Sequence, residues 1–110
     1  QVFPGEVENF IAEKFKDVVE NVGVVGMEHK IFSEGIIAFV EKKKGKQITV
    51  KEIQDACNEI AAYKRPSHII ILEYNTMPLN RVNKIDYQAL KKMAEFEIEK
   101  LRQQGGWDST

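Results

Sequence analysis

The stretch Thr49–Glu52 constrains the fold most, because it places the start of a helix between two runs rich in isoleucine and valine. In such a capping box, the Thr49 and Glu52 side chains each accept a hydrogen bond from a backbone N–H group that the helix leaves free. Ile48 and Ile53 flank the box and can form the accompanying hydrophobic staple. We therefore predict a helix from residue 49, continuing as an apolar stripe until Pro66 forbids further helix.

Hydrophobic periodicity predicts five further elements. They are a helix over 4–19, strands over 22–27, 35–42 and 68–73 with a loop over 27–34, and a last helix between Asp86 and Gly105. The apolar stripe of the last helix is Leu90, Met93, Ala94, Ile98 and Leu101. The order helix, strand, strand, helix, strand, helix predicts an α+β domain, in which helices flank a small sheet of about three main strands.

Composition narrows the classes of protein. A chain of 110 residues with 43% hydrophobic and 30% charged residues fits one domain with one core. Its net charge of −1 gives no field that would hold nucleic acid, and no apolar run reaches the roughly 18 residues of a membrane span. Cys57 is the single cysteine and falls in an apolar stripe, so we expect a core thiol and a reducing compartment, the cytoplasm.

A tight turn between an extended segment and the last helix presents Lys84, the best candidate for chemistry. Asn83 precedes it and is one of the few non-glycine residues that tolerates a left-handed backbone. A lysine is a compact charge with three donors, suited to an oxygen that becomes negative during a reaction. Arg81 could contact the same anion if that anion is a phosphate, since a guanidinium binds phosphate oxygens, although an exposed loop arginine is the alternative.

Three stretches carry a resemblance to a known family. Residues 78–85 resemble the Pro-Arg-Thr-x-x-Gly-Lys-Ile segment of the adenylate-forming acyl-CoA synthetases, with Asn83 where glycine is usual and Lys84 at the catalytic lysine. Residues 2–8 resemble the family's Ile-x-Pro-x-Glu-Ile-Glu, and residues 62–66 resemble its Tyr-Lys-x-Pro. The three stretches follow the family's order at similar spacing.

This resemblance implies that residues 1–102 are the C-terminal lid domain of an ATP-dependent acyl-CoA synthetase, with residues 103–110 as a tail. A carboxylate would attack the α-phosphate of ATP to give an acyl-adenylate and pyrophosphate, and coenzyme A would then displace AMP. Lys84 would serve the first step, and Gln1 would line the thiol path or the nucleotide side. The partners are a small carboxylic acid, such as a fatty or aryl acid, and a large N-terminal domain absent from this chain. That domain would bind most of the ATP, coenzyme A and Mg²⁺, so the isolated chain is expected to be inactive.

Two alternatives remain open. The chain could be the equivalent subdomain of a peptide-synthetase or aryl acid adenylation enzyme, whose acceptor thiol is on a carrier protein. Residues 105–110 look like a natural end of the polypeptide, which favours free coenzyme A. The second alternative is a non-catalytic α+β binding module, in which the lysine turn is a coincidence.

The remaining polar residues predict structural roles. His29 and His68 have no third ligand at metal-site spacing, so we expect no metal site. Lys64 and Arg65 mark a turn before Pro66. The acidic pairs Glu6 with Glu8 and Glu97 with Glu99 suit helix ends and solvated faces.

Overall fold

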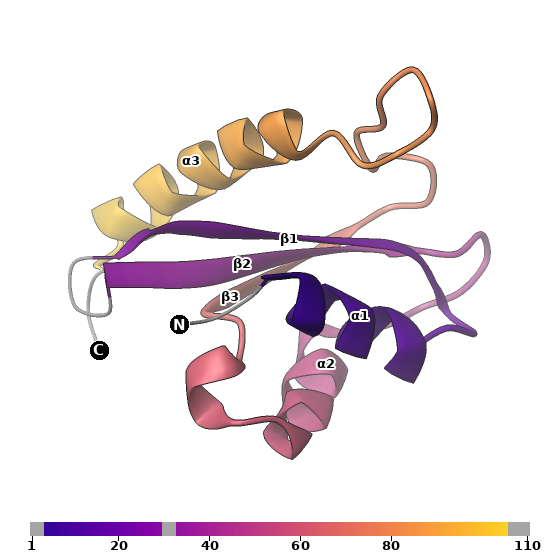
Figure 1. Cartoon of the computed structure of the whole chain (residues 1–110), viewed down its shortest axis with the longest axis horizontal. Helices are drawn as coiled ribbons and strands as arrows, with labels where there is room; N and C mark the ends of the chain where they lie inside the picture. The colour runs from indigo at the N-terminus through magenta and orange to yellow at the C-terminus, as the bar shows by residue number, and fades with distance from the viewer. Residues whose placement is uncertain (1–3, 30–32, 106–110) are drawn as a thin grey trace.

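A three-stranded sheet forms the middle layer of the structure, a computed structural model that describes residues 4–29 and 33–105. The elements are α1 (Pro4–Lys14), β1 (Val19–His29), β2 (Ser33–Lys42), α2 (Val50–Ala56), the 3-10 helices η1 (Cys57–Glu59) and η2 (Ala62–Lys64), β3 (His68–Leu72) and α3 (Tyr87–Gln103). Helix α3 crosses one face of the sheet, and α1 and α2 lie against the other (Figure 1). The predicted α+β class and element order are confirmed.

Strand β2 is the centre of the sheet. It pairs antiparallel with β1 and parallel with β3, in the order β1-β2-β3. Ala38, Phe39 and Val40 of β2 are at most 1% exposed, as expected for a strand covered on both faces. Parallel strands need a crossover connection, and α2 with the two 3-10 helices supplies it between β2 and β3.

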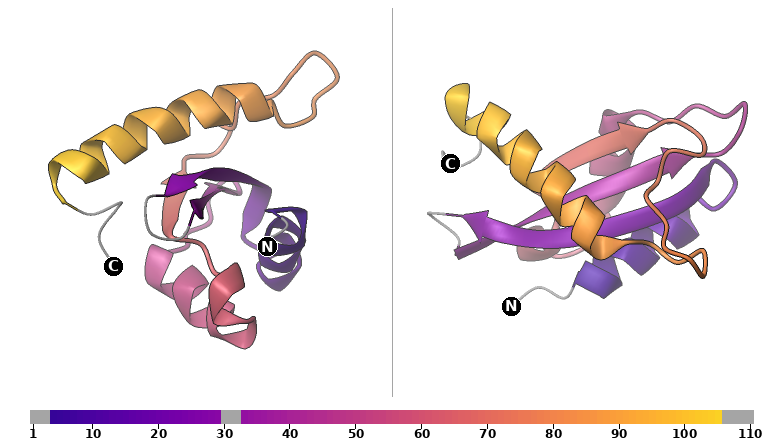
Figure 2. Two further views of the ribbon diagram at one scale, coloured as in Figure 1. Left: turned by 60° about the vertical axis from the view of Figure 1, so that its left-hand side comes forward. Right: turned by 90° about the horizontal axis from the view of Figure 1, so that it is seen from above.

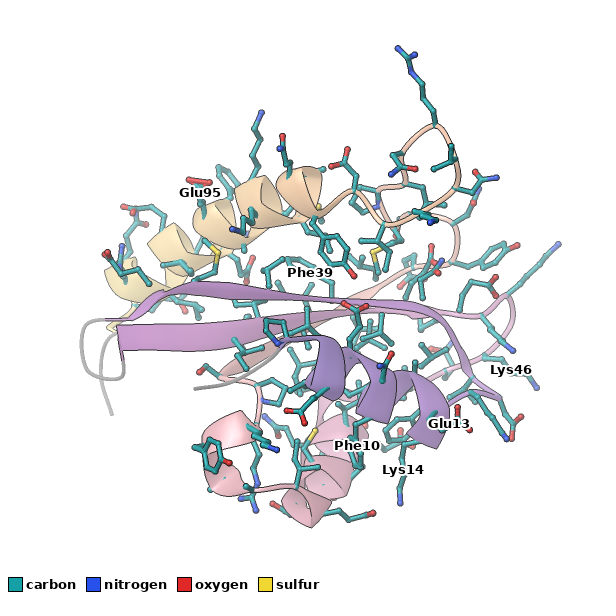
Figure 3. The ribbon with its side chains drawn as sticks, viewed as in Figure 1. Phe10, Glu13, Lys14, Phe39, Lys46 and Glu95 are labelled. Carbon is teal, nitrogen blue, oxygen red and sulfur yellow. The ribbon has the colours of Figure 1, made fainter. Side chains whose placement is uncertain are left out.

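Successive side chains of a strand point to opposite faces, so the sheet divides the buried apolar residues into two cores. The α1/α2 core comprises Val7, Ile11, Val19, Val22, Val24, Ile36, Ala38, Val40, Ile48, Ile53, Cys57 and Ile69. The α3 core comprises Val25, Ile37, Phe39, Met77, Leu90, Ala94 and Ile98. Figure 3 shows Phe39 between the sheet and α3, and Figure 2 shows α3 running across the strands.

The first helix is shorter than predicted, since it ends at Lys14 and not at residue 19. Phe15 still donates its N–H to Ile11, after which the chain turns and enters β1 at Val19. β-Branched residues such as Val18 and Val19 favour extended backbone. The predicted helix continued through these valines, but they belong to the turn and the strand.

The two paired strands are longer than predicted, and the loop over 27–34 is wrong. The antiparallel ladder continues through the pair Met27 and Gly35 to the pair His29 and Ser33. Backbone pairing does not depend on apolar side chains, so it extends beyond the hydrophobic runs that defined the predicted strands.

The capping box of α2 is confirmed. The Thr49 hydroxyl accepts from the N–H of Glu52 (3.2 Å), and the Glu52 carboxylate accepts from the N–H of Thr49 (3.0 Å). Ile48 and Ile53 are both buried in the α1/α2 core, as the staple requires. The helix nevertheless ends at Ala56, well before Pro66.

Arg65 accounts for the irregular segment that follows α2. Its Nε donates to the carbonyl of Ile60 (3.1 Å), and its Nη2 donates to the carbonyl of Asn58 (3.3 Å). In a continuing α-helix, these two carbonyl groups would instead accept hydrogen bonds from backbone N–H groups of the next turn. The structural role predicted for Arg65 is therefore confirmed. Cys57 is 2% exposed, which confirms a core thiol, and burial raises its pKa despite the nearby charge of Arg65.

Helix α3 begins and ends as predicted. The Asp86 carboxylate accepts from the N–H of Ala89 (3.1 Å), and the chain leaves the helix at Gly105, whose φ is +76°. Gln103, predicted to open the tail, is the last residue of α3, and residues 106–110 lie outside the described ranges. Met93 is 36% exposed, so its placement in the apolar stripe is wrong. In the described parts of the chain, no helix is both long and apolar enough to cross a bilayer.

Candidate active site: the lysine turn

Residues 78–86, here called the lysine turn, form a small hairpin before α3. Leu79 and Ile85 make an isolated antiparallel bridge. The N–H of Asn80 donates to the carbonyl of Lys84 (2.8 Å), and the N–H of Asp86 donates to the carbonyl of Pro78 (3.0 Å). Lys84 therefore lies on one arm of a hydrogen-bonded hairpin rather than in an open loop.

Asn83 has a left-handed backbone, with φ of +61°, and its N–H donates to the carbonyl of Asn80 (3.1 Å). This confirms the conformation predicted for Asn83. A Cβ clash makes that region costly for most residues, while asparagine tolerates it. Asparagine thus provides here the turn for which the family segment uses glycine.

Asn80 organises the inside of the turn, and the sequence reading missed it. Its Oδ1 accepts from the N–H of Val82 (3.0 Å) and from the N–H of Lys84 (3.1 Å). Asparagine often holds its own backbone in this way, so its place two residues before Val82 was a usable signal. The side-chain oxygen Oδ1 of Asn80 and the left-handed backbone of Asn83 together fix the backbone conformation at Lys84.

Gly23 of β1 lets the end of the turn lie directly on the sheet. A Cβ atom at Gly23 would be 2.4 Å from Cδ1 of Leu90 and 3.3 Å from Cγ2 of Ile85. Ile85 packs against the α3 core. The residue that follows Lys84 is therefore seated on β1 only because position 23 has no side chain.

The Lys84 and Arg81 side chains are exposed. Within residues 4–29 and 33–105, neither forms an ion pair or a side-chain hydrogen bond. Both are thus available to an anion supplied from outside this chain. Gln1, the third predicted site residue, lies outside the described residues.

Glu8 connects three elements, a role that the sequence did not predict. Its carboxylate accepts from the N–H of Val24 on the edge strand β1 (3.0 Å) and from the hydroxyl of Tyr87 (2.7 and 2.8 Å). Burial, together with the hydrogen bond and the charge of Glu8, raises the pKa of Tyr87 to about 12. Tyr87 follows the lysine turn directly, so this hydrogen bond links the start of α3 to α1. Glu6 instead pairs with Lys64 (3.4 Å), which agrees with a structural role for Lys64.

The described histidine and carboxylates do not build a metal site. His68 Nε2 lies 3.5 Å from Glu97 Oε1, and Glu97 also pairs with Lys100 (3.8 Å). Glu97 therefore joins β3 to α3 and is not the solvated carboxylate that we predicted. Among residues 4–29 and 33–105, no group of three or more His, Cys, Asp or Glu side chains is placed to hold a metal ion.

Residues 6–84 match the model of a protein family, the AMP-binding enzyme C-terminal domain. The chain belongs to this family. The match ends at Lys84, and it confirms the resemblance drawn from the three sequence stretches.

Two relatives of the chain carry the names of CoA ligases. The chain is 29% identical over 93 residues to a 2-succinylbenzoate–CoA ligase of Geobacillus sp. (strain WCH70), covering 84% of the chain and 18% of the relative. It is 30% identical over 98 residues to a mitochondrial medium-chain acyl-CoA ligase of Danio rerio, covering 88% of the chain and 16% of the relative. The chain thus spans less than a fifth of the length of these enzymes.

Solved structures share the fold. The crystal structure of ATP-bound MatB from Rhodopseudomonas palustris matches with a TM-score of 0.72 and 26% identity, over 84% of this chain and 18% of that one. A double mutant of the o-succinylbenzoate CoA synthetase of Bacillus subtilis, bound with a product analogue, matches with a TM-score of 0.69 and 30% identity. The match covers 83% of this chain and 18% of that one. The fold is therefore that of the C-terminal domains of adenylate-forming enzymes.

Proposed function

We propose that this chain is the C-terminal catalytic lid of an ATP-dependent acyl-CoA synthetase and that Lys84 serves the adenylation step. The observation that supports this proposal is the lysine turn. Its left-handed Asn83 and the hydrogen bonds of Asn80 fix the backbone at Lys84, whose side chain is exposed and unpaired among the described residues. A lysine held in this way is suited to an anion that docks against the domain.

The two half-reactions place different demands on Lys84. When the carboxylate attacks the α-phosphate of ATP, negative charge builds on the phosphate oxygens, and a positioned ammonium group stabilises it. When the thiol of coenzyme A displaces AMP, the reacting centre is the acyl carbonyl carbon. We therefore assign Lys84 to the first half-reaction only. Arg81 is a weaker candidate for a phosphate contact, and Gln1 for the thiol path or the nucleotide side.

The rest of the active site belongs, in this proposal, to a large N-terminal domain of the same polypeptide. The relatives support it, because the part of them that matches this chain is only 16–18% of their length. Residues 1–102 would then be the lid and residues 103–110 its tail. ATP, coenzyme A and Mg²⁺ would bind mainly to the N-terminal domain, so we expect no turnover from the isolated chain. No step that we assign to residues of this chain depends on Mg²⁺.

The names of the relatives support coenzyme A, rather than a carrier-protein thiol, as the acceptor. Their acids differ, a succinylbenzoate in one and medium-chain acids in another, so the proposed substrate is a carboxylic acid without a narrower class. The buried thiol of Cys57 fits a reducing compartment, and we keep the cytoplasm as the proposed location.

Lys84→Ala in the full-length enzyme tests the function. We expect the rate of acyl-adenylate formation to fall by about 10² or more, while thioester formation from preformed acyl-adenylate is retained. The matched control is Lys91→Ala, which removes the same charge from an exposed position of α3 and should leave both rates unchanged. Equal losses in both half-reactions would refute the assignment of Lys84. Absence of carboxylate-dependent ATP–pyrophosphate exchange in the unmodified parent would support the binding module instead.

A further inference from the structure

A buried carboxylate lies beneath the segment that leads into the lysine turn. Glu41 of β2 is 2% exposed, and within the described ranges it is the one charged residue that is buried. It follows Val40 along β2, so its side chain points to the same face of the sheet as Phe39, the face that α3 covers. Such a residue is rare in a core unless it is well hydrogen-bonded.

Two donors from different parts of the chain satisfy Glu41. Its Oε1 accepts from Nδ2 of Asn21 (2.8 Å), the residue directly opposite on β1. Its Oε2 accepts from the backbone N–H of Met77 (3.0 Å). The carboxylate thereby joins the sheet to residue 77, which immediately precedes the lysine turn.

Met77 anchors the chain directly before the lysine turn. Its side chain is 5% exposed and belongs to the α3 core. The next residue, Pro78, accepts the hydrogen bond from Asp86 that closes the hairpin. A displacement at Met77 therefore moves the arm that carries Asn80, and Asn80 holds the N–H of Lys84.

We propose that Glu41 is a positioning residue for Lys84, acting through the backbone N–H of Met77. This inference rests on the proposed role of Lys84 in adenylation. The other arm of the turn has its own attachments, the cap of Asp86 and the contact of Tyr87 with Glu8. Glu41 supplies the matching attachment for the first arm, and without it the N–H of Met77 would be buried and unpaired.

Kinetics of the full-length enzyme test the proposal. Glu41→Leu keeps a similar volume but removes both acceptors, so we expect adenylation to slow by about tenfold or more, since a misplacement of about 1 Å can cost roughly 10²-fold. Thioester formation from preformed acyl-adenylate should stay within about twofold, because this positioning concerns only the first half-reaction. A merely structural role would lower the active fraction and so reduce both rates equally.

Conservative and control variants sharpen the test. Glu41→Gln keeps an acceptor for Met77 and can pair with the amide of Asn21 after that amide turns over, so adenylation should recover to within about threefold of the unmodified enzyme. Glu73→Gln removes the same charge from an exposed carboxylate that pairs with Lys42 (2.9 Å), and should change neither rate. A Gln variant as impaired as the Leu variant would overturn the proposal.

Should Glu41→Leu fail to fold, Glu41→Asp replaces it. The shorter carboxylate cannot span Asn21 and Met77 together, so adenylation should again fall more than thioester formation.

Amide hydrogen exchange in the 110-residue chain gives an independent readout. In Glu41→Gln and Glu41→Asp, any loss of protection at Met77 and Lys84 should scale with the loss of adenylation, and unchanged protection in an impaired variant would overturn the mechanism. Lys84→Ala is measured in parallel: normal adenylation there refutes the proposed function, whereas an impaired Lys84→Ala beside a normal Glu41→Leu refutes only the inference.

Discussion

The α1/α2 core and the lysine turn lie on opposite faces of one sheet and are held by different forces. The core consists of apolar residues, together with Cys57, brought together by burial. The turn depends on directed contacts: the acceptors of Asn80 and Asp86, the left-handed backbone of Asn83, and the bond from Met77 to Glu41. Burial is non-directional, whereas hydrogen bonds fix orientation. A fold can be stabilised by the first, but aiming a single lysine requires the second.

Stability and adenylation should therefore respond to different substitutions. Changes on the α1/α2 face should lower the free energy of unfolding and leave the catalytic rate of folded molecules intact. Changes beneath the turn should lower the adenylation rate by more than their effect on stability accounts for. Three substitutions, in order of decreasing effect, test this separation.

Gly23→Ala should have the largest effect. The added Cβ would be 2.4 Å from Cδ1 of Leu90 and 3.3 Å from Cγ2 of Ile85, so the buried Leu90 side chain must repack or push α3 away, and Ile85 must shift slightly. We expect about 1–3 kcal/mol of destabilisation from overpacking. Adenylation by the folded fraction should also fall, because Ile85 follows Lys84 directly. Urea unfolding measures the change in stability, and the adenylation rate measures the change in catalysis. An unchanged rate per folded molecule would show that the packing of Ile85 on Gly23 does not position Lys84.

Thr49→Ala should destabilise the domain without affecting its chemistry. The substitution removes the cap of α2 and leaves the N–H of Glu52 without its acceptor, which costs about 0.5–2 kcal/mol. Because α2 packs on the face opposite the lysine turn, adenylation per folded molecule should hardly change (Figure 1). A shift in unfolding free energy below about 0.2 kcal/mol would mean that the cap contributes little. A lowered rate per folded molecule would contradict the separation of the two faces.

Tyr87→Phe should have the smallest effect, visible mainly at high pH. The pKa of Tyr87 rises from its ordinary value of 10 to about 12 in the folded chain, so folding favours the protonated hydroxyl. This contribution to stability is complete below pH 10 and is lost as the pH rises through about 12. The difference in stability between the native protein and Tyr87→Phe should therefore shrink between these values. A difference that stays constant with pH would show that burial and Glu8 do not hold the hydroxyl of Tyr87 in its neutral form.

The sequence was most informative where a local rule decides the structure. The Thr49 box, the Asp86 cap and the left-handed Asn83 each depend on a few neighbouring residues, and all three are present. The end of α2 was mispredicted because Arg65 binds carbonyl groups five and seven residues before it, and periodicity cannot register such contacts.

The supports of the turn were least visible in the sequence. A glutamate at the end of a strand ordinarily faces solvent, whereas Glu41 is buried and accepts a hydrogen bond from Met77, 36 residues later. The contact of Glu8 with Tyr87 spans 79 residues. Neither pairing has a local signature, so both required the tertiary structure.

The most direct test of the account is the adenylation rate of two Asn83 variants in the full-length enzyme. Glycine adopts a φ of +61° without a Cβ clash, so Asn83→Gly should adenylate at close to the native rate. Valine is a true outlier at positive φ, so Asn83→Val should misdirect Lys84 and slow adenylation by roughly 10²-fold, with thioester formation from preformed acyl-adenylate retained. If Asn83→Val adenylates as fast as the native enzyme, the turn does not position Lys84 and the account is wrong.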